Sequence, residues 1–168
     1  MSEPTTNPDA AIKLKEKLEG LDIAMMTTQA ASGYMSSRPM YTSEVESTGT
    51  LWFFTSDKSG KIAELQRDNH VNLSYVNADE DIYVSVAGRA ELVEDKGKMH
   101  DLWNPMLKAW FPDELETPDI ALLKITADHA EYWDTSSSLM LHLYGVAKAT
   151  LTGESARGDA EHEELDIR

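Results

Sequence analysis

The chain has 168 residues, no cysteine and a formal net charge of −15, which suits one domain that buries its own core without disulfides or Cys-ligated metals. Its acidity argues against nucleic acid and anionic membrane surfaces as partners. Neither an apolar run of about 18 residues nor an N-terminal signal pattern is present, so we expect a cytoplasmic protein with no membrane partner.

In chain order, the residue patterns predict short strands interrupted by a few helices. Residues 10–150 are expected to form one domain, with flexible tails at 1–9 and 153–168. The apolar periodicities predict helices over 10–18, 61–68 and 96–111, the last broken at Pro105, and strands over 22–29, 35–41, 50–56, 71–77, 82–92 and 120–133. Gly88 is expected to mark a β-bulge. Short links between strands favour a mainly β fold, an antiparallel barrel of about six strands.

The stretch from the second to the third predicted strand suits a bound phosphate. The third strand ends in a Ser-Gly-Lys turn that opens a helix, where unpaired N–H groups and the helix dipole favour anions. Ser59 and Gly60 allow close approach of the backbone, Lys61 adds a charge, and Arg38 can add a bidentate contact from the neighbouring strand. The residues alone leave an alternative open, in which Ser59 or Gly60 merely caps a surface helix and Arg38 pairs with a carboxylate.

Other catalytic patterns are missing. No pair among the five histidines has metal-ligand spacing, so we expect no metal site. The chain also lacks a nucleophile elbow. Glu161, Glu163 and Glu164 are expected to form a solvated acidic run. Met25, Met26, Met99 and Met106 are expected to pack in the core.

Four segments, taken in order, resemble the FMN-binding split barrels related to pyridoxamine 5′-phosphate oxidase, in particular the bacterial general stress proteins. They cover roughly residues 10–133. The segments are D-I-A-M-M-T-T from Asp22, S-S-R-P-M from Ser36, W-F-F-T-S-D-K-S-G-K from Trp52 and A-E-Y-W-D from Ala130.

This resemblance implies an FMN site. Arg38 and Lys61 would hold the phosphate, with Ser59 and Gly60 close by. The strand residues Pro39, Met40, Phe54 and Thr55 would border the isoalloxazine ring. Trp133 would approach from the second subunit of a homodimer, with FMN at the subunit interface. From the residues alone, a Trp at the end of an apolar strand is more often core or interface filling than part of a cofactor site.

The chain departs from the oxidases after Trp133. These enzymes carry an Arg-Leu-His and a further Arg that hold the substrate, whereas this chain has His142 but no arginine between Trp133 and Arg157. We therefore expect no oxidation of pyridoxamine 5′-phosphate. Three functions stay open: a flavin-dependent oxidoreductase with NAD(P)H as a possible electron donor, a non-catalytic FMN-binding protein that buffers flavin or senses redox state, and a flavin-free interaction module.

Overall fold

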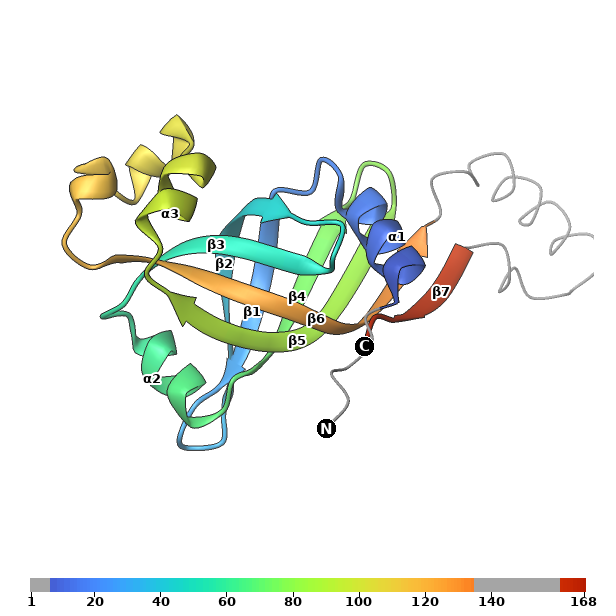
Figure 1. Cartoon of the computed structure of the whole chain (residues 1–168). Helices are drawn as coiled ribbons and strands as arrows, with labels where there is room; N and C mark the ends of the chain where they lie inside the picture. The colour runs from blue at the N-terminus through green and yellow to red at the C-terminus, as the bar shows by residue number, and fades with distance from the viewer. Residues whose placement is uncertain (1–6, 135–160) are drawn as a thin grey trace, which may run out of the picture.

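A computed structural model describes residues 7–134 and 161–168 (Figure 1). The helices and strands, in chain order, are α1 Pro8–Leu18, β1 Ile23–Gln29, β2 Met35–Val45, β3 Thr50–Ser56, α2 Gly60–Arg67, β4 His70–Asn77, β5 Ile82–Val93, α3 Lys96–Leu102, the 3-10 helices η1 Pro105–Ala109 and η2 Glu114–Glu116, β6 Ile120–Asp134 and β7 Glu161–Asp166. None of the described helices is long and apolar enough to cross a membrane.

Six antiparallel strands close into a barrel, as the sequence predicts. The strand order is β3-β2-β1-β4-β5-β6-β7, and β3 also pairs with β6, which closes the ring. The long strand β6 pairs with β5 along its length, with β3 over its first half and with β7 over its second. The bulge predicted at Gly88 is confirmed, because the β5–β6 register shifts between Ala87 and Gly88. A Cβ at Gly88 would lie 2.5 Å from the carbonyl oxygen of Thr126, so only glycine fits there.

The alternating strand residues point their apolar side chains into the barrel. This core includes the fully buried Leu73, Val86 and Ile125, and α1 adds Ala11 and Leu14 at one end (Figure 1). Because burial of such residues is the main favourable term in folding, the alternation fixes which face of each strand points inward.

A second apolar cluster lies outside the barrel, between β3 and β6 and the α3–η2 segment. It includes Trp52, Phe54, Leu107, Phe111 and Leu122. The predicted helix over 96–111 is divided as expected, since α3 ends at Leu102 and η1 begins at Pro105, whose missing N–H suits a helix start.

The last described residues, 161–168, correct one prediction. The sequence predicts a flexible tail over residues 153–168, but Glu161–Asp166 is a strand paired with β6. Leu165 and Ile167 are buried, and the N–H of Asn7 donates to the carbonyl of Ile167 at 2.9 Å. Burial of two aliphatic side chains and ladder hydrogen bonds offset the polar composition that suggests disorder. At the other end, α1 begins at Pro8, two residues inside the predicted tail.

The acidic run within that strand is also not simply solvated. The hydroxyl of the buried Tyr132 lies 2.7 Å from carboxylate oxygens of both Glu161 and Glu163. Lys17 of α1 contacts Asp134 at 2.7 Å and Glu161 at 3.3 Å. These charges hold α1, β6 and β7 together at one end of the barrel (Figure 1).

Candidate functional site

Strands β2 and β3 separate from each other at the candidate binding site. The pairing of β2 with β3 ends at Thr42 and Phe53. Beyond them, residues 35–41 pair with β1 alone and Phe54–Ser56 pair with β6 alone, among the residues that the structure describes. A pocket of about 260 Å³ opens at this gap between the two strands, and η1 and the start of α2 complete its wall.

Seven of the nine residues that the sequence singles out line this one pocket. They are Arg38, Pro39, Met40, Phe54, Thr55, Ser59 and Lys61. Gly60 is the first residue of α2, next to the pocket, and a Cβ there would meet no atom within 4 Å, so the space above the helix start is open.

One end of the pocket is cationic. The Lys61 ammonium donates to the hydroxyl of Ser59 at 2.9 Å, and no carboxylate pairs with it in residues 7–134 or 161–168. Burial, together with the positive charge of Arg38, lowers the pKa of Lys61. A bound anion would oppose this lowering of the pKa, because an opposite charge favours the ammonium form.

Arg38 is tied to its neighbours. Its guanidinium donates to the hydroxyl of the buried Thr28 at 2.5 Å and to Glu64 at 3.2 Å, and Thr28 donates to the same Glu64 oxygen at 2.5 Å. The hydrogen bond from Thr28, aided by the charge of Arg38, holds the pKa of Glu64 below its ordinary value. The carboxylate pairing left open by the sequence is therefore real, and it coexists with a place for Arg38 in the pocket wall.

Ser59 occupies the N-cap position of α2, but its side chain makes no capping hydrogen bond. Its hydroxyl instead accepts from Lys61. The first N–H groups of α2 therefore lack the usual side-chain acceptor, which is the condition under which a helix start attracts an anion.

The other end of the pocket is apolar and aromatic. Phe54 and Phe111 meet there with ring centroids 6.3 Å apart, and Trp103 packs edge-on against Phe54 at 5.7 Å. Sequence reasoning missed several lining residues: Ile23, Tyr41, Ser56, Leu107, Trp110 and Phe111. The last three fall in a segment whose apolar spacing indicates only a helix face.

Trp133 does not line this pocket. It lies near the far end of β6, where its ring stacks on His162 with centroids 5.1 Å apart and an interplanar angle of 8°. His162 in turn lies 2.7 Å from Glu131. Within one chain, then, the structure brings Arg38, Lys61 and Phe54 together and leaves Trp133 on a different surface. The predicted role of Trp133 concerns a second subunit and stays a prediction.

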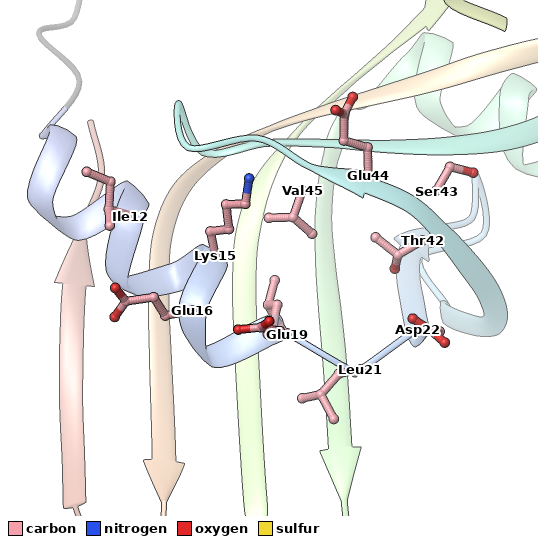
Figure 2. Close-up of a pocket in the computed structure, with 11 residues that line it drawn as sticks. Ile12, Lys15, Glu16, Glu19, Leu21, Asp22, Thr42, Ser43, Glu44 and Val45 are labelled. Carbon is pink, nitrogen blue, oxygen red and sulfur yellow. The ribbon is translucent and has the colours of Figure 1, made fainter. Parts of the chain in front are cut away.

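A larger pocket of about 360 Å³ lies between α1, the loop after it and the end of β2 (Figure 2). Its wall mixes aliphatic side chains such as Ile12 and Val45 with Lys15 and acidic groups such as Glu16 and Glu19. Among residues 7–134 and 161–168, no histidine or arginine lines it, and no group of three or more His, Asp or Glu side chains could hold a metal ion. Its chemistry is less specific than that of the β2–β3 pocket.

Comparisons with known proteins identify the same family that the four sequence segments resemble. The family model described as pyridoxamine 5′-phosphate oxidase like matches residues 9–157. Protein bli-3 of Neurospora crassa is 31% identical over 167 residues, which cover 89% of this chain and 80% of that protein.

Solved structures of general stress proteins are also similar to this chain. The general stress FMN/FAD binding protein of Xanthomonas citri is 29% identical, with a TM-score of 0.66 over 79% of this chain and 94% of that one. General stress protein 26 of Bacillus anthracis is 27% identical, with a TM-score of 0.63 over 71% of this chain and 92% of that one. The resemblance inferred from the four sequence segments is thereby confirmed.

Proposed function

The chain belongs to the pyridoxamine 5′-phosphate oxidase-like family, and from this premise we propose that it is a stress-related flavoprotein that binds FMN in the β2–β3 pocket. One observation carries the proposal: a single pocket joins a cationic end to an aromatic end. FMN has the matching polarity, with a phosphate dianion at one end and a flat apolar ring system at the other. The FMN/FAD binding described for the Xanthomonas citri protein supports a flavin.

The phosphate would be held by Lys61, Arg38 and the start of α2. Lys61 lacks a carboxylate partner among the described residues, so its charge is available to a ligand. Charge-assisted hydrogen bonds of this type contribute about 1.5–3 kcal/mol each. The isoalloxazine ring would lie against Pro39, Met40, Phe54 and Thr55, where the buried Met40 and Phe54 exclude water.

When bound, the flavin would supply hydride or electron transfer, which needs no acidic or basic side chain from the protein. The described residues then bind and orient it. We therefore propose an FMN-dependent oxidoreductase, with NAD(P)H as a possible donor. A non-catalytic FMN-binding protein that buffers flavin or senses redox state is the second candidate, because the cationic end and the aromatic wall of this pocket would bind flavin equally well without catalysis.

We also propose a homodimer with the flavin at the interface. A band of exposed apolar side chains crosses the outside of the barrel from Ile23, in the pocket wall, to Trp133. Val76, Tyr83 and Trp133 are successive cross-strand partners on β4, β5 and β6. Val76 is 57% and Ile23 49% exposed.

Met25 links the two parts of this band, because it pairs with Ser74, two residues before Val76. A twofold interface is self-complementary. If the band of one subunit packs antiparallel against the same band of its partner, the end of the partner's band that carries Trp133 lies at the pocket. The family resemblance implies this place for Trp133.

The test of the cofactor is direct. The protein is purified from cells, its flavin is released and identified by chromatography, and the apo-protein is titrated with FMN and FAD. We expect a yellow protein with one FMN per chain. Consumption of NAD(P)H with an added electron acceptor then separates the oxidoreductase from the buffering protein. A colourless protein that quenches the fluorescence of neither FMN nor FAD would contradict the proposal.

A further inference from the structure

The η1 segment forms a firmly held wall of the pocket. Leu107 and Phe111 are buried against the barrel, and the side chain of Asn104 accepts from the N–H of Met106 at 3.0 Å, which caps the start of η1. These contacts anchor the segment on the barrel, so a side chain that projects from it has a defined position.

Trp110 projects from this wall. It lines the pocket, yet 60% of its surface is exposed. Met106, on the same segment, is exposed to the same degree, 61%, but does not line the pocket. Stacked aromatic rings attract one another beyond the effect of burial. The exposed indole of Trp110 has no stacking partner among the described residues, so it offers a surface on which a planar ligand can stack.

The charges near this wall restrict what can stack there. Lys108 is the one cation between residues 105 and 116, and Glu114 engages its ammonium at 2.5 Å. Asp113 and Glu116 add further negative charge to the same segment. Like-charge repulsion and the absence of an unpaired cation on this stretch disfavour an anionic ligand.

We propose that Trp110 is a specificity-determining residue that recruits an uncharged, planar aromatic molecule to the mouth of the pocket, beside the flavin. Quinones are the class that combines these properties with the ability to accept electrons from a reduced flavin. The proposal rests on the FMN site proposed above and names the substrate class for it. Lys61 and Arg38 serve the flavin phosphate at the other end, so the ligand at Trp110 meets the aromatic and apolar part of the pocket wall.

Equilibrium dialysis tests the proposal without any turnover. FMN-loaded protein, with the flavin oxidised, is dialysed against 1,4-naphthoquinone or the anionic 1,4-naphthoquinone-2-sulfonate, which share one ring system. The chain has no cysteine, so the quinone finds no thiol to alkylate. We expect the uncharged probe to bind more tightly than the sulfonate.

The Trp110→Ala variant should bind naphthoquinone about tenfold more weakly, as expected for loss of a ring contact worth about 1.4 kcal/mol. Trp110→Phe should recover most of the affinity. Met106→Ala is the matched control and should change nothing, because Met106 is equally exposed on the same segment but lies outside the pocket wall.

The outcomes separate the two proposals. If wild-type protein takes up no FMN, both proposals are overturned. If FMN binds but Trp110→Ala retains naphthoquinone, or if Met106→Ala loses as much, the inference about Trp110 is wrong while the flavin site stands. Weaker FMN binding in Trp110→Ala with unchanged naphthoquinone binding would assign Trp110 to the flavin and also overturn the inference.

Discussion

Nη2 of Arg38 lies 3.2 Å from Oε2 of Glu64, so the arginine beside the pocket shares its charge with a carboxylate before any ligand binds. The two side chains come from β2 and α2, and Thr28 of β1 donates to the same carboxylate oxygen. Among the described residues, Lys61 therefore contributes the unpaired positive charge of the pocket, and Glu64 fixes the position of the guanidinium.

We expect the Glu64→Ala substitution to destabilise the apo-protein by roughly 1–3 kcal/mol, because it leaves the buried Thr28 hydroxyl without its acceptor. Glu64→Gln keeps an acceptor oxygen and should cost less. Urea unfolding measures both. The exposed Gln66→Ala on the same helix is the control. Wild-type stability in Glu64→Ala would show that this network does not hold α2 on β1.

Acid should unfold the protein partly through Asp128. Burial alone would raise the pKa of this carboxyl, but hydrogen bonds from Arg89 and Arg168 outweigh it and lower the pKa from its ordinary value of 3.8. The folded-state pKa is thus depressed, so the carboxylate stabilises the fold above the ordinary pKa, and this contribution is lost as the pH falls through the folded-state value.

The free energy of unfolding of Asp128→Asn should therefore fall less than that of wild type between about pH 5 and pH 2. Glu91→Gln is the control, since Glu91 is exposed and its contact with Lys124 is long, at 3.9 Å. Parallel pH profiles for Asp128→Asn and wild type would rule out this role.

Assembly is tested by Val76→Glu. The side chain is already exposed, so the monomer fold should survive, but a charge in the middle of a buried twofold interface should break the dimer. Light scattering should show wild type at twice the chain mass and Val76→Glu at the chain mass, with weaker FMN binding. Ile12→Glu, an exposed aliphatic position on α1, should stay dimeric. A wild-type protein that binds FMN as a monomer would contradict the proposed interface.

Pyridoxamine 5′-phosphate should not be oxidised at a meaningful rate. Residues 135–151 supply His142 and no arginine to hold a substrate phosphate, although these residues lie outside those that the structure describes. Formation of pyridoxal phosphate by FMN-loaded protein is the assay. Turnover near 1 s⁻¹, the low end of ordinary enzymes, would overturn the prediction and make Lys148 the first residue to replace.

The strands and the cationic end of the pocket could be predicted because local patterns determine them. Alternation identified the barrel strands, and the Ser-Gly-Lys turn placed Lys61 at a helix start. The Arg38–Glu64 contact and the wall around Trp110 depend on long-range packing, which no spacing along the chain reveals. Strand β7 was missed because Leu165 and Ile167 stand among charged residues. Met25 and Met106, predicted to be core residues, are exposed, while Met26 and Met99 are buried as expected.

The most direct measurement compares FMN with riboflavin, which lacks the phosphate, by fluorescence quenching on four proteins: wild type, Arg38→Ala, Lys61→Ala and Lys58→Ala. Arg38→Ala and Lys61→Ala should each lose about 1.5–3 kcal/mol of FMN binding, roughly 10- to 150-fold. Both should bind riboflavin nearly as wild type does. Lys58 is exposed in the same turn but outside the pocket wall, so its variant should bind FMN normally. Equal losses for FMN and riboflavin, or no quenching by wild-type protein, would contradict the phosphate site at Arg38 and Lys61.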